Sequence, residues 1–166
     1  MDPDHTTFTE LFARHSAEVF RFAYWLSGDA DVARDICSET FVRVWTSAQP
    51  IRGLTVKAYL FTIARRLYLQ HQRKAARHSP LTDQAVGGSR HTEQLTEDRS
   101  ELDHVLAAMA TLPEEDRSVL IMRAVEELSH EEIALATGLS IASVKVRIFR
   151  ARAKLVALTS SQQETP

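Results

Sequence analysis

The sequence predicts an all-α protein with two small helical domains, at residues 5–78 and 101–159, joined by a flexible linker at residues 79–100. Apolar residues recur at intervals of three, four and seven positions on both sides of the linker, which is the spacing of one helical face. Within the linker the chain turns polar, loses this periodicity and carries a Gly-Gly pair. Hydrophobic residues make up 44% of the chain, so both parts can form a core.

Three helices are expected in the first domain. The first spans residues 8–26 and stops at Gly28, because glycine tolerates the left-handed conformation at a helix end, while Asp29 can cap the next helix. The second helix runs from about residue 31 to 46. A break containing Pro and Gly follows, and the third helix then runs from about residue 56 to 77.

The second domain is expected to end in a helix-turn-helix. Pro113 and the three acids after it open one helix, since acids are stabilised at the positive end of the helix dipole. Ser129 and Glu132 have the spacing of a capping box, so a short helix should follow them, and Gly138 can end it. A final helix over residues 141–158 completes the pattern of helix, tight turn and helix.

Charge is distributed unevenly along the chain, although the net charge is only −2. Residues 1–40 carry eight acids against three Lys or Arg, whereas residues 41–80 carry eight Lys or Arg and no acid. Residues 81–140 hold thirteen acids against four bases, and residues 141–166 hold five bases against one acid. Two basic blocks alternate with two acidic ones, which predicts two surfaces that face a polyanion.

The final helix is the first of these surfaces. Its apolar stripe should pack on the domain and leave Val146 and Phe149 on the opposite side, among basic residues. In a DNA major groove, apolar groups contact thymine methyls while Arg and Lys contact guanine edges or phosphates. A solvated basic face is the alternative, but the capping box and glycine turn favour DNA. The candidate duplex contacts are Ser143, Lys145, Val146, Arg147, Phe149 and Arg150.

The third helix is the second basic surface. Tyr59, Arg66, Arg73 and Arg77 share one side of it, away from its apolar stripe. An aromatic ring within an arginine stripe suits unstacked bases and a phosphate track. The alternative is that Tyr59 simply covers the core.

The second helix combines acids with large apolar side chains. Such a face suits a protein partner with basic residues rather than DNA. The alternative is that Phe41 and Trp45 belong to the core and that the acids are solvated.

Several other classes of protein are disfavoured. The seven His residues are scattered without metal-ligand spacing, and there is neither a nucleophile elbow nor a glycine-rich phosphate loop. We therefore expect no enzyme, no catalytic residue, no metal and no cofactor. Cys37 is alone, which excludes an intramolecular disulfide. No stretch reaches the roughly 20 apolar residues of a membrane span and no signal peptide is visible, so the expected location is the cytoplasm.

Taken together, these motifs resemble the extracytoplasmic-function (ECF) sigma factors of bacterial RNA polymerase, over roughly residues 8–158. The segment 35–45 resembles sigma region 2.2, and the segment 59–66 resembles regions 2.3 to 2.4. Further segments resemble region 4, at residues 112–117, 128–134 and 143–155. The chain departs from the family pattern at Ser38, Tyr59, Arg66, Gln70 and Glu127, where the family has Gln, Trp, Asn, Asp and Gly.

The resemblance implies a fold, partners and residue roles. Sigma region 2 would bind the clamp helices of the polymerase largest subunit, and sigma region 4 would bind the −35 duplex and the polymerase flap. The implied polymerase contacts are Asp35, Ser38, Glu39, Phe41 and Trp45. The implied contacts to a melted −10 element are Lys57, Tyr59, Arg65, Arg66, Arg73 and Arg77. An anti-sigma factor is the implied regulatory partner, which can hold the chain at the membrane, and a stress response is the implied setting.

The competing hypothesis is a LuxR-like helix-turn-helix regulator that acts on duplex DNA without joining polymerase. In that case residues 1–80 would form a sensor or dimerisation module. The acid-free stretch 41–80 discriminates between the two, because a strand-holding domain needs eight uncompensated cations and a sensor does not.

Overall fold

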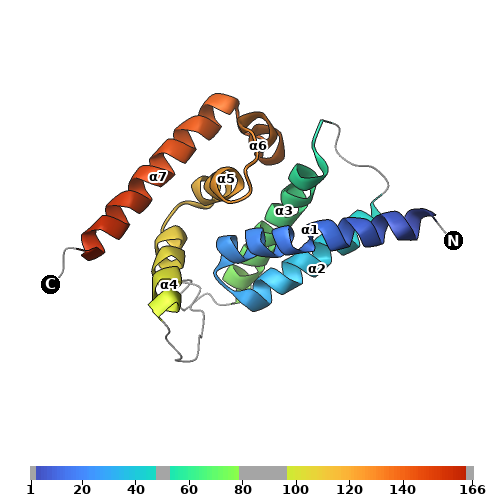
Figure 1. The fold of residues 1–166 in the computed structure, drawn as a ribbon, viewed down its shortest axis with the longest axis horizontal. Helices are drawn as coiled ribbons and strands as arrows, with labels where there is room; N and C mark the ends of the chain where they lie inside the picture. Colours follow the sequence, from blue (N-terminus) through green and yellow to red (C-terminus); the bar gives the residue numbers. More distant parts are fainter. Residues whose placement is uncertain (1–2, 48–52, 79–96, 164–166) are drawn as a thin grey trace.

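The computed structural model describes residues 3–47, 53–78 and 97–163, and the regular elements within these ranges are all helices (Figure 1). In chain order they are α1 (Pro3–Ser27), α2 (Ala30–Thr46), α3 (Val56–His78), α4 (Glu97–Ala110), α5 (Glu114–Ala124), α6 (His130–Thr137) and α7 (Ile141–Gln163). The all-α prediction is confirmed. We call α1–α3 the first bundle and α4–α7 the second bundle.

Helices α1, α2 and α3 pack against one another around an aromatic core. Gly28 adopts a left-handed φ of 69°, and the Asp29 carboxylate accepts the Asp31 backbone N–H at 2.8 Å, so the predicted break and cap are both present. The centre of the core is a stacked pair, Phe22 and Phe61, whose ring centroids lie 4.7 Å apart. Both rings are fully buried.

The second bundle contains the predicted helix-turn-helix. The Ser129 hydroxyl accepts the Glu132 N–H at 3.1 Å, and the Glu132 carboxylate accepts the Ser129 N–H at 2.9 Å, which completes the capping box. Gly138 ends α6 with a left-handed φ of 76°. Helix α7 continues to Gln163, beyond the predicted end at residue 158.

The predicted linker is shorter than expected on its C-terminal side. Helix α4 begins at Glu97, so the last four residues of the predicted range 79–100 are helical. Residues 79–96 lie outside the described residues, and the tether prediction for them is not tested.

Glu127 occupies the loop between α5 and α6 with a φ of 59°, a left-handed conformation that costs an L-residue roughly 1–2 kcal/mol. Its side chain is exposed. Because glycine adopts this conformation without that steric cost, Glu127→Gly should raise the free energy of unfolding by about 1 kcal/mol in urea denaturation. The matched change Glu131→Gly, inside α6, should lower it by about 1 kcal/mol. A loss of stability in Glu127→Gly would contradict the assigned strain.

The two bundles pack on each other, with α1 against α4 and α5, and α3 against α6 (Figure 1). A tether between the bundles does not by itself predict such contacts. Lys57 and Arg65, two of the candidate site residues, take part in these contacts.

Candidate nucleic-acid interface

Helix α7 presents the two faces that its sequence predicts. The Ser140 hydroxyl accepts the Ser143 N–H at 3.1 Å and so caps the helix. Val144 and Ile148 are buried against the second bundle, whereas the side chains of Val146 and Phe149 are 59% and 76% exposed. A phenylalanine with three quarters of its surface in water forms no part of the core. We call this the outer face of α7.

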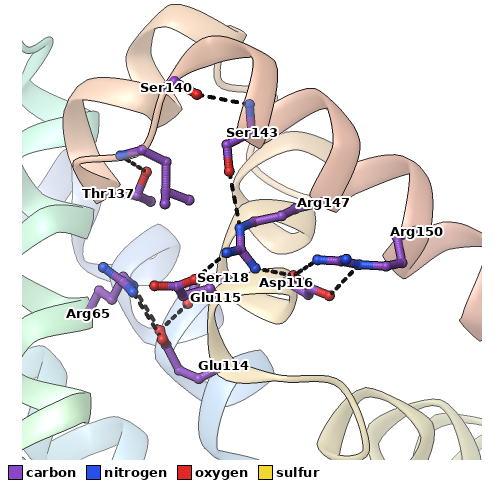
Figure 2. A network of polar contacts seen from close by, with 11 residues as sticks. Arg65, Glu114, Glu115, Asp116, Ser118, Thr137, Ser140, Ser143, Arg147 and Arg150 are labelled. Atoms are coloured by element: carbon purple, nitrogen blue, oxygen red, sulfur yellow. Dashed lines mark hydrogen bonds and ion pairs between the residues drawn. The ribbon is translucent and has the colours of Figure 1, made fainter.

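Arg147 is held inside an ion-pair network between α5 and α7 (Figure 2). Its Nη1 donates to Asp116 Oδ1 at 2.8 Å, and its Nη2 lies 2.7 Å from Glu115 Oε2. Its Nε donates to the Ser143 hydroxyl at 3.3 Å. The hydrogen bond that Arg147 donates to Asp116 raises the pKa of the guanidinium. Arg147 therefore fixes α7 on α5, and Ser143 belongs to the same network.

Arg150 differs from Arg147 in its freedom to reach outward. Its side chain is 59% exposed and its Nε lies 3.4 Å from Asp116 Oδ2. Lys145 is exposed too. The outer face of α7 thus consists of Lys145, Val146, Phe149 and Arg150. The other two candidates, Ser143 and Arg147, belong to the network that holds α7 on α5.

The candidate −10 residues on α3 fall into two groups. Arg66, Arg73 and Arg77 are exposed. Lys57 and Arg65 instead contact the second bundle: Lys57 Nζ donates to the Glu126 carbonyl at 2.8 Å, and Arg65 Nε donates to Glu114 Oε1 at 2.8 Å.

Tyr59, the remaining candidate, is partly buried, and its hydroxyl lies 3.5 Å from the Ser47 hydroxyl. It neither lies in the core nor projects fully into solvent. The structure therefore does not decide whether the Tyr59 ring stacks on unpaired bases or covers the core.

Glu126 is a site residue that the sequence did not reveal. Its side chain is completely buried, and Arg21 approaches it with two hydrogen bonds, Nε to Oε1 at 2.8 Å and Nη2 to Oε2 at 2.9 Å. This pairing raises the pKa of Arg21. Arg21 lies 105 positions away in the sequence, so no local pattern predicts the contact.

The outward face of α2 differs from its prediction at one residue. Asp35, Ser38 and Glu39 are exposed, and Trp45 is 45% exposed. Phe41, however, is only 2% exposed and packs in the core of the first bundle, so its side chain cannot contact a partner. The exposed apolar residue of this face is instead Val42, at 58%. Because residues 41 and 42 are adjacent, helix periodicity alone does not decide which of the two side chains faces outward.

A cleft of about 780 Å³ opens beside this face, between α1 and the adjoining ends of α2 and α3. Phe8, Leu11 and Arg14 line it from α1, and Trp45 and Val56 line it from the other two helices. The cleft therefore connects the candidate polymerase face with the start of the candidate −10 helix.

Among the described residues, no group of three or more His, Cys, Asp and Glu side chains could hold a metal ion. Cys37 is buried, and burial raises the pKa of its thiol, so the thiol is protonated at neutral pH. No helix in the described ranges is long and apolar enough to cross a bilayer.

The fold and these surfaces define a class: a helical transcription factor that has a basic helix-turn-helix and a separate bundle with a cationic helix. Comparison with family patterns identifies both bundles. The pattern for Sigma-70 region 2 matches residues 11–78, and that for Sigma-70, region 4 matches residues 102–155. The chain belongs to the sigma-70 family and, within it, to the ECF RNA polymerase sigma factors. The family prediction is confirmed.

Curated relatives support the assignment. The ECF sigma factor EcfG of Rhodopseudomonas palustris is 33% identical, over 82% of this chain and 76% of the relative. SigM of Bacillus subtilis is 29% identical, over 92% and 94%. SigE of Mycolicibacterium smegmatis is 32% identical over 88% of this chain, which spans 59% of that longer relative.

Two solved structures have the same fold. One is the sigma factor RpoE in complex with the anti-sigma factor NepR from Bartonella quintana, with a TM-score of 0.76, 24% identity and coverage of 93% of this chain and 97% of that one. The other is CnrH in complex with the cytosolic domain of CnrY, with a TM-score of 0.72, 28% identity and coverage of 95% and 90%.

Proposed function

We propose that this sigma factor acts in the cytoplasm as a promoter-specificity subunit that grips DNA at two points. Helix α7 binds the −35 duplex, α3 holds the melted −10 strand, and α2 binds core polymerase. The observation that carries the proposal is the outer face of α7, where Phe149 is 76% exposed between Lys145 and Arg150. A solvated helix gains no stability from exposing this ring, whereas a helix in a major groove can use it to contact thymine methyl groups.

Run-off transcription from a genomic library, with purified core polymerase and with or without this chain, tests the proposal. New start sites that depend on the chain are the expected result. Phe149→Glu is the matched variant, because its charge would repel phosphates without touching α2. It should lose the new transcripts yet still co-migrate with core polymerase. Duplex binding without any new transcript would contradict the proposed two-point grip on promoter DNA.

Arg150 and Arg147 should separate base contact from structural support on the same helix. Arg150→Ala should weaken binding to a duplex from a recovered promoter by about 1–3 kcal/mol and change the thermal midpoint much less than Arg147→Ala does, because Arg150 is 59% exposed and its contacts with Asp116 are 3.4 Å long. Arg147→Ala should lower the thermal midpoint, because it leaves the buried Asp116 without its closest partner. Fluorescence anisotropy and thermal unfolding measure the two effects. Equal loss of stability in both variants would contradict the division of roles.

On α2, we place the polymerase contact on Asp35, Ser38, Glu39 and Trp45, with Val42 replacing the buried Phe41. Acids around an exposed aromatic residue suit a partner with basic side chains. This surface does not include any residue of α7, so it remains available when α7 is bound to DNA.

We further propose an inhibitory protein partner for α7, since the related RpoE and CnrH structures are complexes with NepR and CnrY, of which NepR is described as an anti-sigma factor. Five exposed apolar residues recur on α7 at spacings of four and three: Ala142, Val146, Phe149, Ala153 and Val156. At 3.6 residues per turn they form a seam about 80° wide and about 21 Å long. The described part of α7 carries five bases and no acid, so the partner should be an acidic amphipathic helix.

Val156 provides the test for this partner, because a recognition helix contacts bases with its N-terminal residues. Once an inhibitor is isolated, Val156→Glu should weaken its binding about tenfold while duplex binding stays within about twofold. Thr159→Glu places the same charge away from the seam and should leave both unchanged. An inhibitor whose affinity ignores Val156 would contradict the seam.

A further inference from the structure

We propose that the second bundle inhibits the first: carboxylates of the second bundle occupy cations of the first, and the free chain is thereby closed to single-stranded DNA. The proposal rests on the proposed function in one respect, because it takes Lys57 and Arg65 as −10 contacts. Separation of the bundles would then be the step that exposes these cations.

Glu126 forms the first closing contact. Both of its carboxylate oxygens accept from Arg21 of α1, at 2.8 and 2.9 Å, and Lys57 Nζ lies 3.3 Å from Oε2. The Glu126 side chain is 0% exposed, and its cationic partners, Arg21 and Lys57, both belong to the first bundle. A buried carboxylate that keeps two cationic partners is stable, and the same carboxylate with its partners removed must return to water.

Glu114, the first residue of α5, forms the second closing contact (Figure 2). Arg65 of α3 donates to its two oxygens, Nε at 2.8 Å and Nη2 at 2.9 Å. The Ser118 hydroxyl donates to Oε1 at 2.6 Å and orients the carboxylate. The Arg65 side chain is only 13% exposed. This bidentate geometry is the one that arginine would otherwise offer to a phosphate.

Two further contacts extend the closed surface. Arg117 of α5 donates to the Leu26 carbonyl at 2.9 Å, at the end of α1. At the start of α3, a Cβ built on Gly53 would lie 3.8 Å from Leu135 Cδ1 of α6, so α6 lies against the residues that precede α3. The second bundle therefore covers the start of the candidate strand-holding helix as well as Lys57 and Arg65.

A DNA phosphate and the carboxylates of the second bundle cannot bind Arg65 and Lys57 at the same time, and we call this mutual exclusion. The guanidinium edge of Arg65 that faces Glu114 cannot also bind a phosphate, and Lys57 is committed to Glu126 through both its carbonyl and its carboxylate. Arg66, Arg73 and Arg77 stay exposed on the same helix. The closed chain should therefore retain weak, salt-sensitive attraction for single strands and gain its full affinity only on opening.

The test compares two double variants of the full chain that remove the same charge. Glu114→Gln with Glu126→Gln breaks both closing contacts. Glu127→Gln with Glu131→Gln changes two exposed carboxylates of the second bundle and is the matched control for net charge. Small-angle X-ray scattering measures the radius of gyration. Anisotropy at low salt measures binding to a labelled oligothymidylate of about 20 nucleotides.

The first double variant should have a larger radius of gyration than the wild type and bind the oligothymidylate about tenfold more tightly. The control should keep the wild-type radius and change affinity less than about twofold. An unchanged radius in the first variant would overturn closure. A larger radius with the same affinity as the control would overturn mutual exclusion. If the opened variant binds no single strand at all, mutual exclusion and the proposed −10 function both fail, while closure stands on the scattering data.

Discussion

Replacing Asp116 with alanine should lower the free energy of unfolding of the second bundle by about 3 kcal/mol and abolish duplex binding. Asp116 is 3% exposed and accepts from Arg147 at 2.8 Å and from Arg150 at 3.4 Å. Its removal leaves the partly buried Arg147 without its main counterion and removes the ion pair that joins α5 to α7. Because Asp116 also restrains Arg150, the outer face of α7 would lose its fixed position.

Glu115 provides the control, since it lies beside Asp116 and also pairs with Arg147, at 2.7 Å. Its side chain is 44% exposed, so Glu115→Ala should cost less than about 1 kcal/mol and preserve duplex binding. Urea denaturation and anisotropy with a promoter duplex measure both effects. Similar losses in the two variants would mean that burial of Asp116 does not anchor the recognition helix.

Local sequence signals predicted most of the helix-turn-helix. The capping box at Ser129 and Glu132, the left-handed Gly138 and the apolar stripe of α7 all depend on residues within a few positions of one another, and all are present. The sequence also identified Val146 and Phe149 as outward-facing. These features need no knowledge of the rest of the chain.

The role of Arg147 was not predictable from its own helix. Its position among the basic residues of α7 indicated a DNA contact, but its acidic partners lie in α5, about thirty positions earlier. In the sequence, the acids after Pro113 indicate only an interaction with the helix dipole. One of them, Asp116, is also the buried counterion that fixes α7.

The contacts between the bundles were least visible in the sequence. Arg21 with Glu126 and Arg65 with Glu114 join residues 105 and 49 positions apart. In a sequence, an acidic block and a basic block can each bind a partner molecule, or the two can pair within the chain. Only the fold shows which of these occurs. On α2, similarly, periodicity did not decide whether Phe41 or Val42 faces outward.

Replacing Phe22 with alanine should have the largest effect on the first bundle, because this ring is 0% exposed and stacks on Phe61 at 4.7 Å. Loss of a buried phenylalanine costs about 4 kcal/mol. A bundle of this size is stable by roughly 5–10 kcal/mol at most, so a large part of its stability would be lost. Promoter-specific transcription should fail near physiological temperature, since both α2 and α3 depend on this core.

Duplex binding by α7 should nevertheless survive in Phe22→Ala if residues 5–78 and 101–159 are independent domains, as the sequence predicts. The second bundle has its own core, centred on Val119, Ile133 and Val144, which are all fully buried. Phe12→Ala is the control, because Phe12 lies on the same helix but is 45% exposed. Calorimetry should show one lowered transition and one unchanged transition in Phe22→Ala. Loss of duplex binding together with a single lowered transition would mean that the two bundles fold as one unit, because the closing contacts would then be required for both cores.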